Sequence, residues 1–233
     1  MGRTARNPRP RSPKRRHPPH PENARRRDER IQARTTLVRV ATALIAAKGL
    51  ENVTVGEISR TAGLSRPLVY FYFPDLRTLF LEAAGAARSA LLAHLTNGMQ
   101  QAPCGLEAIV AMGRAYLDFH RQQPDAFALC LANTGIRPGS APLTDAESRI
   151  LDLERSLMEQ VVSTVTRGQA DGSVRNDAGD PRMVALHLWA FVQGLVQLSS
   201  QHHVTLERTF GIGRDPFLMA GLDTLKTALA HPQ

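Results

Sequence analysis

One short segment, residues 65–73, combines an arginine, a proline and aromatic side chains at helical spacing. At about 100° per residue, Val69 and Phe73 fall on one side of the helix and face inward. An exposed apolar cluster opposite them is typical of a contact surface, and an arginine beside it can donate two hydrogen bonds to a guanine edge in the major groove of DNA. The alternative is a helical hairpin whose aromatic residues pack against another helix. The contact face consists of Arg66, Pro67, Tyr70 and Phe71.

Residue pairs that could support catalysis or metal binding occur, but they lack the necessary arrangement. Cys130 and His120 could act as nucleophile and base, yet no further residue orients the histidine, which favours a place in the core. His202 and His203 are adjacent, so on a helix they point in different directions and make a poor pair of zinc ligands. The sequence has no Gly-rich phosphate loop, Gly-x-Ser-x-Gly, HExxH or paired-cysteine motif. We therefore expect no enzyme activity, no metal site and no cofactor.

Start and stop signals around the contact face predict two short helices followed by a longer one. Thr54 and Glu57 fit a capping box, in which the Thr54 hydroxyl accepts from the Glu57 amide and the Glu57 carboxylate accepts from the Thr54 amide. Gly63 can take the left-handed conformation of a tight turn. Ser65 can then cap the second short helix, and Asp75 the longer one. This order of elements is that of a helix-turn-helix, which offers its second helix to DNA.

Residues 31–81 resemble the TetR/AcrR family of bacterial transcriptional regulators. The family pattern runs roughly T-x-x-E-I-A-x-x-A-G-V-S-x-x-x-L-Y-x-H/Y-F-x-x-K-x-x-L. One position departs from it, because the lysine that contacts a phosphate in family members is Leu76 here, with Arg77 beside it. The matching residues are Thr54, Glu57, Ile58, Ala62, Gly63, Ser65, Tyr70, Tyr72, Phe73 and Leu79.

The resemblance implies an all-α protein of about nine helices in two domains. An N-terminal helix-turn-helix domain over residues 24–80 would bind DNA, and a C-terminal domain over residues 81–233 would bind a small effector and form the homodimer. The implied function is a cytoplasmic repressor that binds a palindromic operator in double-stranded DNA and is released by the effector. An activator of the same fold, an architectural DNA-binding protein and an enzyme remain the alternatives. The expected DNA contacts are Val55, Leu64, Ser65, Arg66, Pro67, Tyr70, Phe71, Tyr72 and Arg77.

The net charge of +8 is concentrated at the N-terminus. Residues 1–30 hold 11 Lys and Arg against 3 Asp and Glu, whereas the remaining residues hold 18 of each sign. Residues 1–23 are rich in proline and nearly free of apolar side chains, so we expect a disordered basic tail. Its arginines either contact DNA phosphates and the minor groove or stay solvated, and the sequence does not distinguish the two. The charge of the tail therefore carries no argument about the folded part.

Neither a disulfide framework nor a membrane span is expected. Cys104 and Cys130 are too few for a framework and suit a reducing cytoplasm. The most apolar stretch, residues 183–198, is shorter than the ~20 residues that a span needs and contains His187 and two glutamines. We interpret it as a helix that must be covered on more than one side. Further helices are predicted at about 24–48, 75–97, 106–121, 127–131, 144–169, 180–201 and 215–230.

Two sets of apolar residues in the C-terminal half are candidates for binding. Mostly apolar pocket walls favour a lipophilic effector, although plain core packing is the alternative for each wall residue. The family resemblance implies that the last two long helices pair with their two-fold mates, and Gly194 and Gly221 could let helices approach closely. The candidate effector contacts are Met112, Tyr116, Phe119, His120, Phe127, Met158 and Trp189. The candidate dimer contacts are Leu188, Val192, Leu195, Leu218, Leu222 and Leu225.

Overall fold

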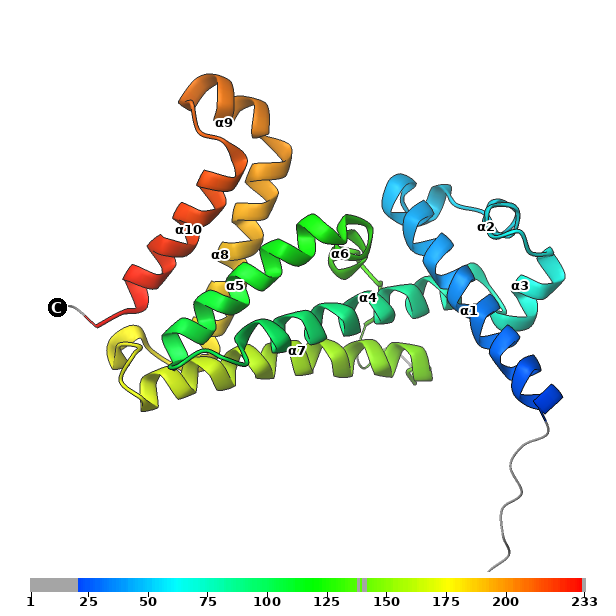
Figure 1. The fold of residues 1–233 in the computed structure, drawn as a ribbon, viewed down its shortest axis with the longest axis horizontal. Coiled ribbons are helices and arrows are strands. Elements are labelled where there is room, and N and C mark those ends of the chain that lie inside the picture. The colour runs from blue at the N-terminus through cyan, green and yellow to red at the C-terminus, as the bar shows by residue number, and fades with distance from the viewer. Residues whose placement is uncertain (1–20, 138, 140–141, 232–233) are drawn as a thin grey trace, which may run out of the picture.

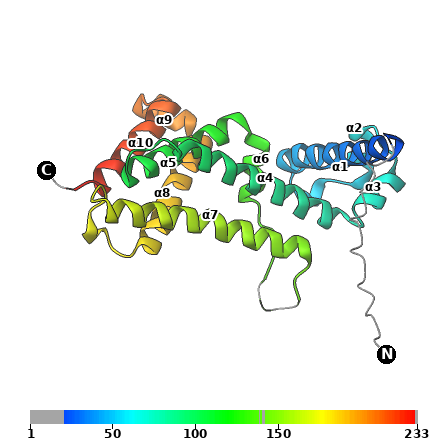
Figure 2. The ribbon, with the colours of Figure 1, turned by 60° about the horizontal axis from the view of Figure 1, so that its bottom comes forward.

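The computed structural model describes residues 21–137, 139 and 142–231, so nearly all of the expected basic tail lies outside the described residues. Within them the chain forms ten α-helices, two short 3-10 helices and no strand, which confirms the all-α class. The molecule is elongated, with a head of α1 to α3 at one end and the C-terminus at the other (Figures 1 and 2). The helices are α1 Pro21–Lys48, α2 Val55–Ala62, α3 Arg66–Tyr72, α4 Leu76–Met99, α5 Gly105–Gln122, α6 Pro124–Leu131, α7 Asp145–Ala170, α8 Pro181–Gln201, α9 His203–Phe210 and α10 Arg214–Leu229.

The first helix begins at Pro21, earlier than the expected start near residue 24. Proline suits the first position of a helix, because it has no amide hydrogen to leave unpaired there. Glu22 in the first turn adds a negative charge where the helix dipole favours one. Both features favour the first described turn of α1.

The caps of the helix-turn-helix form as the sequence predicts. The Thr54 hydroxyl accepts from the Glu57 amide at 3.2 Å, and the Ser65 hydroxyl accepts from the Leu68 amide at 3.4 Å. Gly63 ends α2 in the left-handed conformation, with a φ of 67°. One part of the expected capping box differs, because the Glu57 carboxylate pairs with the Lys48 ammonium at the end of α1. This ion pair ties α2 to α1.

The core of the head extends beyond its own helices. Leu37, Ile58 and Leu79, from α1, α2 and α4, are fully buried in one apolar cluster. Two residues of the body, Leu129 in α6 and Ile150 in α7, belong to the same cluster. Helix α6 packs against both α1 and α4. A movement of α6 would therefore displace side chains in the apolar core of the head.

The body is built on α4 and α7, which lie side by side along the length of the molecule (Figures 1 and 2). Helix α5 packs against both of them, and α8 and α10 pair with each other. Helix α9, which the sequence analysis did not predict, joins α8 to α10. It ends at Gly211 in the left-handed conformation, where the Gly211 and Ile212 amides donate back to the Glu207 and Leu206 carbonyls. None of its side chains is buried, so the helix has no apolar core face that the sequence pattern could reveal.

One side of α8 is covered and the other is not. Val184, Val192 and Leu195 face the core, whereas Phe191 and Leu198 are 41% and 49% exposed. Among the described helices, α8 is the one that is long and apolar enough to cross a membrane by length and composition alone, a test that core helices also pass. The expectation that α8 is covered on more than one side is not met within a single chain.

Candidate DNA-binding surface and ligand cavity

Helix α3 presents the contact face that its sequence predicts. Val69 and Phe73 are buried beneath it, at 1% and 2% exposure. On the outer side, Tyr70 and Phe71 are 52% and 68% exposed, and Arg66 is exposed as well. The orientation predicted from helical spacing is confirmed.

The side chain of Arg66 lies against the start of α2. A Cβ atom at Gly56 would fall only 2.4 Å from the Arg66 Nη2 atom, so the space that a larger residue would fill is occupied by the guanidinium group. Glycine at position 56 therefore lets the arginine rest on the backbone of α2.

The remaining expected DNA contacts surround this face to different degrees. Pro67 and Ser65 are exposed, although the Ser65 hydroxyl already accepts from the Leu68 amide. Tyr72 is half-buried, and its ring meets the ring of Phe71 edge-on at 5.2 Å. Val55 and Leu64 are half-buried as well. Pro67 therefore belongs to the contact face and Ser65 borders it, whereas the three half-buried residues add little exposed surface.

Arg77, another of the expected DNA contacts, bonds to residues of the body. Its guanidinium donates to the Thr134 carbonyl at 3.0 Å and to the Glu147 carboxylate at 2.9 Å. Both partners belong to the body, one before α7 and one in its first turn. The sequence did not predict these bonds, because the Glu147 partner lies 70 residues away. Arg77 connects the start of α4 to the body.

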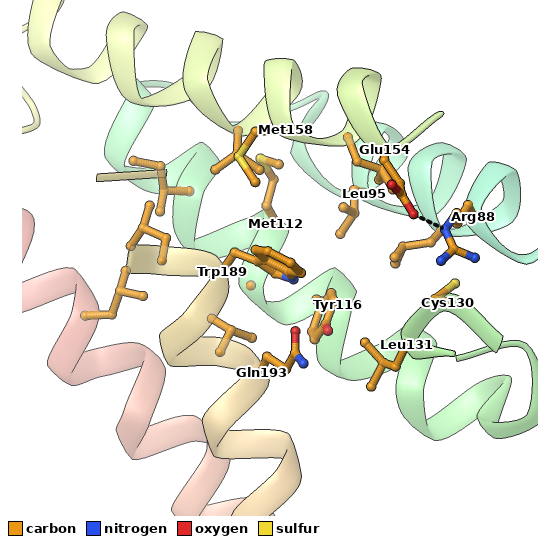
Figure 3. A pocket seen from close by; sticks show the side chains of 18 of the residues that line it. Arg88, Leu95, Met112, Tyr116, Cys130, Leu131, Glu154, Met158, Trp189 and Gln193 are labelled. Atoms are coloured by element: carbon orange, nitrogen blue, oxygen red, sulfur yellow. Dashed lines mark hydrogen bonds and ion pairs between the residues drawn. The ribbon is translucent and has the colours of Figure 1, made fainter. Parts of the chain in front are cut away.

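A cavity of about 590 Å³ lies in the body among α4, α5, α7, α8 and α10 and the segment after α6. Four of the predicted effector contacts line it: Met112, Tyr116, Met158 and Trp189. Figure 3 shows Trp189 and the two methionines on one side of the cavity and Arg88 with Glu154 on the other. The size falls within the range of small-molecule sites.

Three predicted effector contacts are elsewhere in the core. Phe119 is fully buried and packs on the ring of His94. Phe127 meets Tyr116 edge-on at 5.1 Å and so lies behind the cavity wall. His120 accepts a hydrogen bond from Arg214 at 2.6 Å, which ties α5 to the start of α10. Burial and the nearby arginine lower the pKa of this histidine, so the neutral ring that accepts the bond is favoured.

The residues predicted for the dimer interface face the interior of the single chain. Leu195 and Leu218 are buried in the core of the body. The other four line the cavity: Leu188, Val192, Leu222 and Leu225. The Cβ position of Gly221 meets Leu195 of the same chain, whereas that of Gly194 faces open space. The sequence did not predict this placement, because a helix such as α8, apolar on nearly all sides, does not reveal which side packs against the core of its own chain.

The sequence analysis missed the polar residues of the cavity, chiefly Arg88, Cys130 and Glu154. Arg88 occupies a position in α4 that otherwise continues a buried stripe through Ala84 and Leu91. An arginine in such a stripe is a signal that the sequence does contain, because buried charges are rare without partners. Burial raises the pKa of the Cys130 thiol to about 12, so this side chain is neutral and unsuited to act as a nucleophile. No cluster of metal-ligating side chains occurs among the described residues.

A helix-turn-helix head joined to a helical body is the arrangement of a DNA-binding regulator. Comparison with known proteins agrees. Residues 37–83 match the model described as bacterial regulatory proteins, tetR family. Residues 109–225, half of the chain, match the model of a tetracyclin repressor-like C-terminal domain. The chain belongs to the TetR family of transcriptional regulators, and it is a regulator and not an enzyme.

Similar proteins extend over most of the chain. An uncharacterized HTH-type transcriptional regulator of Mycobacterium tuberculosis is 27% identical over 173 residues, which is 73% of this chain and 83% of that protein. A Rhodococcus protein of unknown function has a similar fold, with a TM-score of 0.68 and 24% identity over 85% of this chain and 95% of its own. A candidate transcriptional regulator from Saccharomonospora viridis, in complex with choline, has a TM-score of 0.69 and 20% identity over 86% and 99%. These two structures support the fold.

Proposed function

We propose that this TetR-family protein is a cytoplasmic, homodimeric repressor that binds a palindromic operator and releases it when a lipophilic small molecule enters the body. The cavity carries the proposal, because its wall includes residues that also hold the head. Thr134 lines the cavity, and its carbonyl accepts from Arg77 at the start of α4. A molecule that displaces the segment after α6 would strain this bond.

Arg88 provides a second connection between cavity and head. Its guanidinium lines the cavity and donates to the Leu129 carbonyl in α6 at 3.1 Å. The Leu129 side chain belongs to the apolar cluster of the head. An effector lowers operator affinity only if it binds the low-affinity arrangement of the heads more tightly than the other. Both connections offer a route by which filling the cavity changes the position of the head.

The homodimer rests on the uncovered side of α8 and α10. Phe191, Leu198 and Met219 are exposed apolar side chains on these two helices, and a shallow groove of about 380 Å³ runs beside Phe191. Open space above Gly194 would let a second helix approach closely. One head presents a two-turn helix, too small a contact for useful affinity, whereas two heads on one dimer bind a two-fold operator with avidity.

The test is operator binding by the purified full-length protein. Footprinting on the DNA upstream of its own and neighbouring genes should show an imperfect palindrome with half-sites about one helical turn, or a multiple, apart. Fluorescence anisotropy should then show weaker binding when a lipophilic compound fills the cavity. The small molecule held by the Saccharomonospora viridis protein supports this expectation of a ligand.

Two outcomes would contradict the proposal. If the folded protein binds all DNA sequences with equal affinity, the proposal of a specific operator is wrong. A footprint that overlaps no promoter but precedes one, with transcription lost on deletion of the gene, would favour the activator of the same fold.

A further inference from the structure

The cavity contains a hydrogen-bond donor that the protein leaves unused. Tyr116 is only 8% exposed, and its hydroxyl group is buried without a hydrogen-bond partner. Burial raises the pKa of this phenol, so it stays protonated and able to donate. A buried hydroxyl without a partner costs free energy, and native proteins rarely leave one unless something else satisfies it. Tyr116 lines the cavity but its hydroxyl oxygen is covered, so a ligand can supply the missing acceptor once the side chains around the hydroxyl shift.

Arg88 adds a buried positive charge at the same site. It is 5% exposed, and its bonds to the protein use Nε and Nη1: to Glu154 at 3.1 Å and to the Ala84 and Leu129 carbonyls at 3.3 and 3.1 Å. Nη2 takes part in none of these bonds. The Glu154 side chain is 45% exposed, so solvent screens its charge more than that of Arg88. The arginine is only partly neutralised.

Most of the remaining cavity lining is apolar, and its other polar residues are Asn133, Thr134 and Gln193, of which Gln193 lies beside Tyr116 (Figure 3). Figure 3 shows Arg88, Glu154 and Cys130 together on one side, with Tyr116 between them and Trp189. The Cys130 thiol is neutral and adds no negative charge. Aliphatic side chains make up the larger part of the walls, among them Leu91, Leu95, Ile109, Leu157, Val161 and Leu188. A ligand that bonds to the polar side of the cavity and fills its apolar side has one polar end and one apolar body.

We propose that the effector is an amphiphile with an apolar body and a carboxylate head, whose oxygens accept hydrogen bonds from the Tyr116 hydroxyl and Arg88 Nη2. This inference rests on the proposed function, since it names the chemistry of the same cavity. A cationic head is disfavoured because Glu154, the one acidic residue in the lining, already pairs with Arg88. A neutral head would satisfy the tyrosine but leave the arginine partly uncompensated.

Trp189, the only tryptophan in the chain, lines the cavity and reports on binding through its fluorescence. Decanoate, decanol and decyltrimethylammonium share one chain length and differ in the head group. Titrated at pH 7.5 below the concentrations at which they form micelles, decanoate should bind at least about tenfold more tightly than the other two, the difference that one hydrogen bond to a charged group makes.

The variant Tyr116→Phe removes the unused hydroxyl and nothing that the protein itself bonds. Its thermal stability without ligand should equal or exceed that of the wild type. Its affinity for decanoate should fall about 10- to 100-fold, and its affinity for decanol by a smaller factor. The matched control is Val161→Ala on the apolar wall, which should weaken decanoate and decanol by a similar factor.

Three results would overturn the inference: equal affinity for the three head groups, preference for the ammonium, or unchanged decanoate binding in Tyr116→Phe. Absence of binding by all three probes would overturn it too. The proposed function would survive each of these results if another compound released the operator, and it would fail independently if the protein bound no operator at all.

Discussion

The head and the body of this protein differ in how completely their cores are filled. In the head, Leu37, Ile58 and Leu79 are fully buried, and together with their neighbours they hold α3 in place. In the body, the side chains leave a cavity of about 590 Å³. A filled core suits a part that must present one rigid surface, whereas an unfilled core leaves room for a ligand. Helix α4 runs through both parts, and α6 of the body also packs on α1 of the head.

Exposed apolar side chains occur in both parts, but they have different surroundings. On α3, Tyr70 and Phe71 stand beside an arginine, which suits a polar groove lined with acceptors. On α8, Phe191 and Leu198 stand near the open position above Gly194, which suits another helix. Exposure identifies a contact surface, and the adjacent residues indicate the kind of partner.

The largest effect should come from Leu222→Arg. Leu222 is 1% exposed, so an arginine would bury an uncompensated charge, which costs roughly 3–5 kcal/mol. Thermal and urea unfolding followed by circular dichroism should show a protein that is unfolded or nearly so. A stable variant would mean that α10 packs differently from the arrangement described.

The matched change on the outer side, Phe191→Arg, should leave the protomer folded. The arginine would be solvated in a single chain but would bury a charge in the proposed dimer. We expect a helical monomer in sedimentation at low micromolar concentration, with operator binding lost although α3 is intact. The control Ser89→Arg adds the same charge on the exposed side of α4 and should remain dimeric. A dimeric Phe191→Arg protein would place the interface elsewhere.

One substitution made in both cores tests the difference in packing directly. Leu79→Ala in the head should cost about 2–5 kcal/mol, because the cavity that it leaves is surrounded by close-packed atoms. Leu157→Ala in the body should cost less, since Leu157 is only partly buried and already borders open space. Urea unfolding monitored by circular dichroism measures both. Equal costs would argue against the cavity.

Arg66→Ala tests the contact face without affecting either core. It should cost roughly 1–3 kcal/mol and relax specificity at one base pair per half-site, because the guanidinium is the only long polar donor on the face. Anisotropy with the operator and its point variants is the measurement. Arg155→Ala, which removes an exposed arginine of α7, should bind as the wild type does. Unchanged selectivity in Arg66→Ala would reject the assignment.

The smallest effect should come from the cap of α4. The Thr78 amide donates to the Asp75 carboxylate at 2.6 Å and holds its pKa below the ordinary value. Asp75→Ala should cost about 0.5–2 kcal/mol at pH 7. Because the folded pKa is lowered, this stabilisation is present above the ordinary pKa of about 3.9 and is lost as the pH falls through the folded value. The difference between the two proteins should therefore shrink below about pH 4, and a constant difference would contradict the role of the charge.

Residues close together in the sequence determined the helix-turn-helix. The caps at Thr54, Ser65 and Asp75 and the turn at Gly63 each depend on atoms within four residues, so the sequence was sufficient to predict them. The orientation of α3 followed as well, since Val69 and Phe73 repeat at helical spacing. Only the Glu57 carboxylate was misplaced, because Lys48 competes for it.

Tertiary structure decided which residues line the cavity and which side of α8 stays uncovered. On a helix that is apolar nearly all round, the sequence does not distinguish the roles of Val192 and Phe191. The positions of α7 and α10, which pack against α8, bury the first and expose the second. Arg88 and Glu154 are 66 residues apart, and no local pattern predicts that they meet. Local hydrogen bonds specify where a helix begins and ends, whereas the choice between interior, cavity and surface depends on the free energy of packing against distant segments.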